Sequence, residues 1–247
     1  MTGDLKYKTG LAGIIDFDPG SWEKKIPRNC MVDRNKTLLK LCSGQRVLHL
    51  GAADYPFHKE GAVNDALLHQ RLNKVAEKVI GIEQNKDAIE YLKSNHGIDN
   101  IIYADTTANL PINDDRLNDN FDVILCCDII EHVENPGLLI EFCKKYMMEK
   151  TLLVITTINA SSIKLALRAL QGREAVHHDH VAYYSYSTLC QLLFRYQLVP
   201  VQTGFFSYGT KLKITGWIFN FMANIAPASA DGIVITCKKR GHSTFSV

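Results

Sequence analysis

Short apolar strands alternate with helical segments along most of this 247-residue chain, and this alternation limits the fold more than any other feature. Strand-like runs are expected at residues 46–50, 78–82, 100–104, 121–127 and 151–156. Helical spacing of apolar residues occurs at residues 30–42, 62–76, 86–94, 136–147, 161–170 and 185–196. Because parallel strands need a crossover connection, which is usually a helix, this order predicts a mostly parallel sheet with helices on both faces.

The last part of the chain departs from this alternation. Strands are expected at residues 199–206 and 232–238, without an ordinary amphipathic helix between them. This absence predicts an antiparallel edge strand in a doubly wound, seven-stranded α/β sheet. Residues 1–29 show no hydrophobic periodicity, so we expect an irregular N-terminal arm followed by a single domain of residues 30–247.

Composition excludes several classes of protein. Hydrophobic residues make up 46% and charged residues 22%, which is typical of a globular protein and excludes a disordered or fibrous one. The net charge is only +2 and no long run of like charges occurs, so no nucleic-acid partner is expected. The seven cysteines form no C-x-x-C pair, which indicates a reducing, cytoplasmic protein without disulfides or a zinc–thiolate site.

No transmembrane segment or signal peptide is expected. The first ten residues lack an apolar stretch, and no run approaches the roughly 18 apolar residues of a spanning helix. The nearest candidate, Gly216–Ala226, is too short. We expect its apolar part, residues 217–225, to be a core or edge helix, with a substrate lid or a membrane-surface patch as the alternatives.

Residues suited to binding a nucleoside follow four of the expected strands. They are Gly51 and Ala52, Glu83, Asp105 and Thr106, and Asp128. Ligands of an open α/β sheet bind beyond the carboxyl ends of its strands. There a turn of small residues lets a ligand approach backbone N–H groups. Carboxylates at the same place can accept hydrogen bonds from ribose hydroxyls or from an adenine amino group. Each residue alone can be explained as a tight turn or a helix cap, but their joint occurrence predicts a cofactor site.

The motifs around these residues resemble those of class I S-adenosylmethionine-dependent methyltransferases over residues 44–240. The segments that match the cofactor-binding half of that family are VLHLGAADYP, GIEQN, ADTTANLP and FDVILCCDIIEHVENPGLLIEF. The later segments LLVITTIN and HHDHVAYYSYSTLCQLL are similar to ubiquinone-type and bacterial glycan-modifying O-methyltransferases. The resemblance implies a Rossmann-like methyltransferase fold and S-adenosylmethionine as cofactor, with Glu83 at the ribose, Asp105 at the adenine and Asp128 at the methionine amino group.

The first loop departs from the family pattern. The family usually has G-x-G-x-G, whereas this chain keeps only Gly51, followed by Ala52, Ala53 and Asp54. The same loop disfavours a dehydrogenase, because a dinucleotide pyrophosphate needs close approach to glycines at a helix N-terminus. The acid Glu83 also comes later after Gly51 than the roughly 20 residues of dinucleotide-binding folds.

The run His177-His178-Asp179-His180 is the second group of chemistry-bearing residues. It is either a polar loop leading to the helix cap Ser185 or a loop that projects a histidine into the substrate cleft. Methyl transfer to a hydroxyl requires positioning and removal of a proton, and histidine suits that task near neutral pH. We expect His180 or His178 to be the base, with His132 as a third candidate.

The pattern Asp128-x-x-Glu131-His132, with a later histidine, resembles the metal-binding set of some methyltransferases. These include small-RNA 2′-O-methyltransferases and certain quinone enzymes. The resemblance implies that Asp128, Glu131, His132 and His180 are candidate ligands for a hard or borderline cation. The alternative is that Glu131 only braces the loop, and whether a metal binds stays open.

These observations favour methyl transfer from S-adenosylmethionine to oxygen on a small polar acceptor. The glycan-related resemblance implies a role in polysaccharide biosynthesis, with a sugar or a phosphorylated or nucleotide-linked glycan precursor as acceptor. One alternative is an RNA 2′-O-methyltransferase with a metal site, against which the near-neutral charge argues. Another is a catalytically silent cofactor-binding partner protein. The identity of the acceptor, oxygen versus nitrogen as the methylated atom, and the oligomeric state are left open by the sequence.

Overall fold

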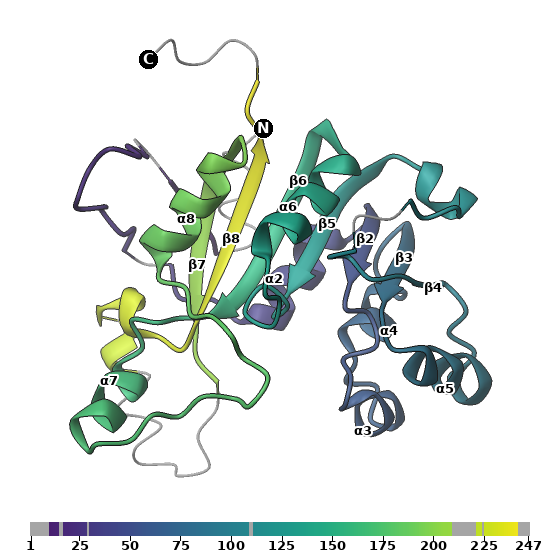
Figure 1. The fold of residues 1–247 in the computed structure, drawn as a ribbon, viewed down its shortest axis with the longest axis horizontal. Helices are drawn as coiled ribbons and strands as arrows, with labels where there is room; N and C mark the ends of the chain where they lie inside the picture. The colour runs from purple at the N-terminus through teal and green to yellow at the C-terminus, as the bar shows by residue number, and fades with distance from the viewer. Residues whose placement is uncertain are drawn as a thin grey trace.

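An eight-stranded sheet forms the centre of the molecule in the computed structural model, which describes residues 10–14, 17–28, 30–108, 111–208, 221–223 and 225–241. The strands are β1 (Ala12–Gly13), β2 (Arg46–Leu50), β3 (Lys78–Glu83), β4 (Ile101–Tyr103), β5 (Phe121–Cys127), β6 (Met147–Ile158), β7 (Leu198–Phe206) and β8 (Gly232–Lys239). They lie in the order β1-β7-β8-β6-β5-β2-β3-β4 across the sheet (Figure 1).

The directions of the strands confirm the predicted doubly wound topology. Strands β4, β3, β2, β5 and β6 are parallel neighbours, and the chain builds outward from β2 to both sides. Strand β8 runs antiparallel to β6 and β7, as the missing crossover helix between the last two strands indicated. The structure adds β1, which pairs antiparallel with β7 at the edge and, at two residues, is too short to show a periodicity.

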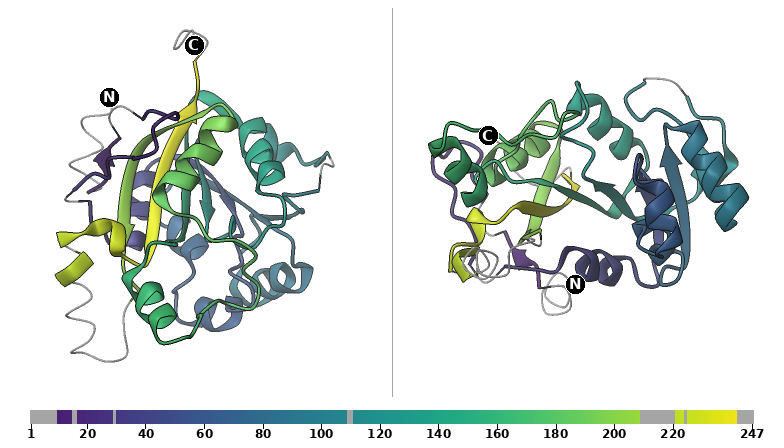
Figure 2. Two further views of the ribbon diagram at one scale, coloured as in Figure 1. Left: turned by 60° about the vertical axis from the view of Figure 1, so that its left-hand side comes forward. Right: turned by 90° about the horizontal axis from the view of Figure 1, so that it is seen from below.

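Helices cover both faces of the sheet (Figures 1 and 2). The helices are α2 (Arg34–Cys42), α3 (His58–Val63), α4 (Leu68–Leu72), α5 (Lys86–His96), α6 (Pro136–Lys145), α7 (Ile163–Leu170) and α8 (Tyr186–Arg195), with 3-10 turns η1 (Asp115–Asn118) and η2 (Pro227–Ser229). Helices α6 and α8 pack on one face and α2 on the other. Helices α3 and α7 lie at the end of the sheet where the parallel strands finish (Figure 1).

The alternation of side chains along β5 explains the two core layers. Ile124 and Cys126 face the layer under α6 and α8, whereas Val123 and Leu125 face the layer under α2. All four side chains are buried. Successive side chains of a strand point to opposite faces, so the continuous apolar run 121–127 is what a central strand buried on both sides requires.

The single helix predicted at residues 62–76 is instead two short helices, α3 and α4. Asp65 adopts a positive φ of 52°, and the Ala66 N–H donates to the Gly61 carbonyl at 2.8 Å, which closes a turn between them. A Cβ on Gly61 would lie 2.5 Å from Leu67 Cδ2, so the chain folds back tightly here. The apolar spacing continued through this turn, and spacing alone does not reveal such a break.

Side-chain caps begin helices α6 and α8, and the cap at Ser185 is the one that the sequence predicts. The Asn135 side chain accepts from the N–H groups of Gly137 and Leu138, with Pro136 at the first position of α6. Ser185 and Thr188 form a capping box at the start of α8. Caps satisfy N–H groups that have no partner within the helix, which fixes where each helix begins.

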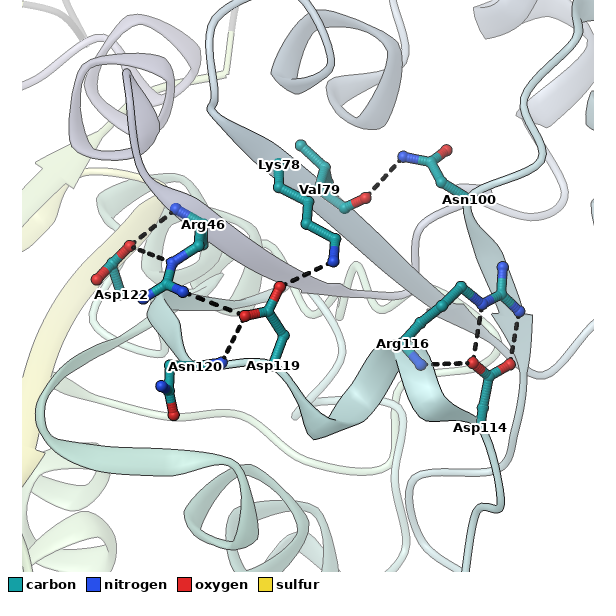
Figure 3. A network of polar contacts seen from close by, with 9 residues as sticks. All are labelled: Arg46, Lys78, Val79, Asn100, Asp114, Arg116, Asp119, Asn120 and Asp122. Atoms are coloured by element: carbon teal, nitrogen blue, oxygen red, sulfur yellow. Dashed lines mark hydrogen bonds and ion pairs between the residues drawn. The ribbon is translucent and has the colours of Figure 1, made fainter.

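Charged residues join β2, β3 and the approach to β5 at the amino ends of the strands (Figure 3). Arg46 donates to Asp119 at 3.1 Å and to Asp122 at 3.5 Å, and Lys78 donates to the other oxygen of Asp119 at 2.8 Å. Arg116 pairs with Asp114 nearby. This end of the sheet is therefore held by ion pairs, and the candidate site lies at the opposite end.

The apolar segment at residues 216–226 falls mostly outside the described residues. Its described part includes helical residues, of which Ala223 is buried while Phe221 is 54% and Ile225 67% exposed. Phe221 is therefore not a buried core aromatic. No helix in the described ranges is both long enough and apolar enough to span a membrane.

Candidate functional site

The loop after β2 is held against the end of β3. The N–H groups of Gly51 and Ala52 both donate to the Ile82 carbonyl, at 2.9 and 3.1 Å. Gly51 adopts a φ of +67°, and a Cβ there would lie 3.0 Å from the Ile129 side chain. Both the positive φ and the close contact require glycine, which explains why this one position keeps it.

Glu83 ends β3 and braces two loops. Its Oε2 accepts from the Ala53 N–H at 3.2 Å, and its Oε1 accepts from Gln84 at 2.8 Å and Asn85 at 3.0 Å. The side chain is only 6% exposed. Two carboxylate oxygens offer about four acceptor sites, so three bonds leave room for one more partner. Glu83 thus has a structural role in the loop that the sequence did not reveal.

Asp105 and Thr106 follow β4, at the same carboxyl end of the parallel strands. The Asp105 Oδ1 accepts from both the N–H and the hydroxyl of Thr107 at 2.7 Å, which lowers the pKa of the Asp105 carboxyl. Both bonds use Oδ1, so Oδ2 can accept a further hydrogen bond. The Asp105 side chain is exposed, as a ligand contact requires.

Asp128 follows β5 with a positive φ of 52° and lies in a charged network. Its Oδ1 accepts from the Thr156 hydroxyl at 2.9 Å and its Oδ2 from the Arg34 guanidinium at 2.6 Å. Arg34 also lies over the Phe206 ring, with its guanidinium carbon 5.9 Å from the ring centroid. Residues from β5, β6, β7 and α2 therefore meet at this point.

Arg34 is a residue of the site that the sequence analysis missed. It opens α2, directly after the cap Asp33, and only the fold brings it to Asp128, 94 positions later in the chain. Its side chain is 19% exposed. The spacing of residues around Arg34 does not distinguish it from the other basic residues of the chain. Its place at the start of a helix was the one signal in the sequence.

Glu131 lies four residues beyond the end of β5 and is almost completely buried. Its Oε2 accepts from the Thr157 hydroxyl at 2.8 Å. Burial, and then the charge of Asp128, raises the pKa of the Glu131 carboxyl to about 7. Its backbone carbonyl accepts from the Val181 N–H at 2.9 Å, which attaches the histidine-rich loop to this segment.

Three histidines meet at the same end of the sheet, and we call His132, His177 and His180 the imidazole cluster. One ring nitrogen of each lies within 4.8 Å of the others. The His132 and His180 ring centroids are 4.5 Å apart, and those of His177 and His180 are 5.1 Å apart. Burial and the neighbouring imidazoles lower the pKa of His132 and of His180, which favours neutral rings at pH 7.

The sequence predicted part of this cluster. His132 and His180 come together as expected, whereas His177 was not singled out. His178 lies beside the cluster, with a side chain 80% exposed and 3.3 Å from Asp179. Among the described residues, the candidate ligands Asp128 and Glu131 do not belong to the compact group of ligand atoms that contains His132 and His180. Asp128 pairs with Arg34, and Glu131 accepts from the Thr157 hydroxyl.

Comparisons with known proteins identify the family of the chain and its fold. Residues 22–203 match the protein family described as "Methyltransferase domain". The chain is similar to a protein named "Ubiquinone biosynthesis O-methyltransferase" from Glaesserella parasuis, with 30% identity over 139 residues, covering 54% of this chain and 53% of that protein. It is also 32% identical over 113 residues to the protein of the same name from Haemophilus ducreyi, covering 44% of this chain and 47% of that protein. The chain thus spans about half the length of the curated relatives it matches.

Solved structures share the fold at low identity. A SAM-dependent methyltransferase from Archaeoglobus fulgidus superposes with a TM-score of 0.53 at 17% identity, covering 83% of this chain and 91% of that chain. The magnesium protoporphyrin IX methyltransferase from Synechocystis PCC 6803, solved with bound SAH, gives a TM-score of 0.51 at 12% identity, covering 80% and 75%. At such identities the likeness extends to the fold alone.

Proposed function

Because the chain belongs to the methyltransferase-domain family, we propose that it transfers a methyl group from S-adenosylmethionine to an oxygen of a small polar acceptor. One observation supports this most. The Gly51 loop, Glu83, Asp105 and Asp128 follow neighbouring parallel strands at the carboxyl end of the sheet, with the imidazole cluster beside them. The names of the curated relatives support oxygen as the methylated atom.

The residues at this edge fit the parts of the cofactor. Asp105 is exposed and Thr106 half-buried at the place for the adenine, and Glu83 keeps one acceptor site for a ribose hydroxyl. Gly51 and Ala52 supply a small turn beneath the ligand. The methionine part of the cofactor carries an α-amino and an α-carboxylate group, and each needs a partner of opposite charge. We assign Asp128 to the amino group and Arg34 to the carboxylate.

The chain positions the acceptor and takes its proton. When bound, S-adenosylmethionine supplies a methyl group on a positively charged sulfur. We assign the role of base to His180, with His178 and His132 as further candidates, because a neutral imidazole beside the end of β5 can accept the hydroxyl proton as the new O–C bond forms. The polar lining of this loop favours a sugar or phosphorylated glycan precursor as acceptor.

A second candidate acceptor is a hydroxyl of a ubiquinone precursor, which the names of the relatives favour. We propose a cytoplasmic location because all seven cysteines are free thiols, as is usual in reducing compartments. Turnover with a panel of sugar, nucleotide-sugar and quinone-precursor hydroxyls, followed as S-adenosylhomocysteine release, separates the two acceptor classes. Binding of the cofactor without turnover of any acceptor would favour the catalytically silent alternative.

Cofactor binding tests the first half of the proposal. Glu83→Gln should weaken S-adenosylmethionine binding by about 1.5–3 kcal/mol, the range for a hydrogen bond to a charged group. Because Glu83 also braces the loops, the exposed Asp105→Ala provides a second variant that retains the fold and should also bind more weakly. Calorimetric titration measures both, with Glu90→Gln on the surface of α5 as control. Unchanged dissociation constants in both variants contradict the proposed site.

Turnover tests the second half. His180→Ala should reduce turnover by roughly 10²–10⁴-fold while leaving cofactor affinity unchanged. His96→Ala, at the far end of α5, is the matched histidine control. Full turnover in His180→Ala contradicts the role of His180 as base and moves the assignment to His178 or His132.

A further inference from the structure

We propose that Tyr208 is a further residue of the proposed cofactor site, and that its hydroxyl binds the α-carboxylate of the methionine part together with Arg34. The inference rests on the proposed function, because it concerns the same cofactor. Strand β7 runs antiparallel to β8, which runs antiparallel to β6, so β7 ends at the carboxyl end of the parallel strands. Tyr208 lies two residues beyond the end of β7 and therefore at the end of the sheet that holds the candidate site.

The Tyr208 side chain lies on the same side of the sheet as Arg34. Side chains alternate along a strand, so residues 206 and 208 share a face. Phe206 belongs to the core layer under α2, and the Arg34 guanidinium lies over its ring. The rings of Phe206 and Tyr208 meet edge to face, with their centroids 5.3 Å apart. Phe206 thus brings the guanidinium and the phenol to one place, although the sequence separates them widely.

Two charged residues from other elements hold the backbone of Tyr208. The Oδ2 atom of Asp231, directly before β8, accepts from the Tyr208 N–H at 2.9 Å. The Lys164 ammonium on α7 donates to the same Oδ2 at 2.6 Å and to the Tyr208 carbonyl at 3.2 Å. The side chains of Lys164 and Asp231 are only 23% and 11% exposed. Tyr208 is therefore fixed before a ligand arrives, which reduces the cost of ordering it on binding.

The surroundings of Tyr208 are charged, and the residue is accessible. Burial, and then the charge of Asp128, raises the pKa of Tyr208, while the charge of Arg34 opposes this shift. Both members of the Arg34–Asp128 pair therefore act on the phenol. Tyr208 is nevertheless 45% exposed, so a ligand can reach it.

A carboxylate needs more donors here than Arg34 supplies alone. The Arg34 guanidinium already donates to Asp128 at 2.6 Å, to the Asn35 Oδ1 at 3.0 Å and to the Thr156 hydroxyl at 3.4 Å. Arginine has five N–H donors, and a carboxylate offers about four acceptor positions. A tyrosine hydroxyl beside the guanidinium adds a donor without a second positive charge, and hydrogen bonds to an ionised acceptor are the strong ones.

Two ligands separate this contact from a general effect on the site. S-adenosylhomocysteine carries the α-carboxylate, whereas 5′-methylthioadenosine has the adenosine and the sulfur without the amino-acid part. Tyr208→Phe removes only the hydroxyl and keeps the ring on Phe206. It should weaken S-adenosylhomocysteine binding at least about tenfold, as for loss of a hydrogen bond to a charged group, and leave 5′-methylthioadenosine binding unchanged.

Calorimetric titration of the full chain measures both affinities. Tyr146→Phe, at the end of α6 and next to the start of β6, is the matched control and should bind both ligands as the wild type does. Unchanged S-adenosylhomocysteine binding in Tyr208→Phe overturns the role of Tyr208 and leaves the proposed function standing. Equal weakening of both ligands also overturns it, because the hydroxyl then supports the site rather than the carboxylate. A wild type that binds neither ligand contradicts the proposed function and this inference together.

Discussion

Two histidines buried beneath the loop after β2 make stability depend on pH. The Nδ1 atoms of His49 and His69 lie 3.2 Å apart, and His69 Nε2 lies 3.1 Å from Asn100 Oδ1. Burial lowers the pKa of His69 to about 4, and burial and His69 lower that of His49 as well. The folded protein thus keeps both rings neutral at a pH where the unfolded chain is already protonated.

The sign of the effect follows from proton binding. Between pH 6.5, the ordinary histidine pKa, and pH 4 the unfolded state binds more protons, so stability falls as the pH falls. His69 alone should reduce the free energy of unfolding by about 2 kcal/mol from pH 7 to pH 5. Urea unfolding of wild type and His69→Gln at both pH values measures the difference. His96→Gln is the control, and an equal pH dependence in wild type and His69→Gln contradicts the argument.

Among the elements, strand β3 has no room for added volume at Gly81. A Cβ on Gly81 would lie 2.7 Å from Ala52 Cβ, 2.8 Å from His69 Cε1 and 3.0 Å from Ile101 Cγ1. Gly81→Ala should therefore cost about 1–3 kcal/mol of stability, the usual range for overpacking. Because we assign Ala52 to the proposed cofactor site, the same change should weaken S-adenosylmethionine binding. Unfolding and calorimetric titration measure the two effects, and a fully stable variant contradicts this packing.

Helix α8 depends on its capping box. The Ser185 hydroxyl accepts from the Thr188 N–H, and the Thr188 hydroxyl accepts from the Ser185 N–H. Ser185→Ala should reduce the free energy of unfolding by about 1 kcal/mol, as for other N-cap serines. Ser94→Ala, on the exposed side of α5, is the control for loss of a serine hydroxyl. Equal losses in both variants would mean that the cap contributes nothing particular.

The elements also show how far the sequence predicts this fold. Apolar spacing predicted the five parallel strands and helices on both faces, because a strand buried on both faces must be apolar throughout. It missed the break between α3 and α4, because Asp65 with its positive φ does not interrupt the apolar pattern. For the site, strand ends indicated Glu83 and Asp128, whereas Arg34 and His177 reach the site only through contacts between distant segments.

At the scale of the whole molecule, the two ends of the sheet differ in what holds them. Ion pairs of Arg46 and Lys78 with Asp119 and Asp122 stabilise the amino end within the protein. At the carboxyl end, Arg34 pairs with Asp128, which we assign to the cofactor, and three imidazoles lie side by side. The carboxyl end is therefore where a bound ligand adds most to the stability of the fold.

Ligand-induced stabilisation measures that contribution. S-adenosylhomocysteine at 100 times its dissociation constant should add about 2.7 kcal/mol of stability and raise the melting temperature by about 5–10 °C. Arg34→Gln removes the proposed partner of the ligand carboxylate, so the shift at the same ligand concentration should fall to half or less. Comparing the shift within each variant removes the separate cost of leaving Asp128 without Arg34. Lys36→Gln is the control, because Lys36 lies on the same helix with a side chain 77% exposed. Equal shifts in wild type and Arg34→Gln would show that the ligand carboxylate lies elsewhere, and a halved shift in Lys36→Gln would attribute the effect to the charge of α2 as a whole.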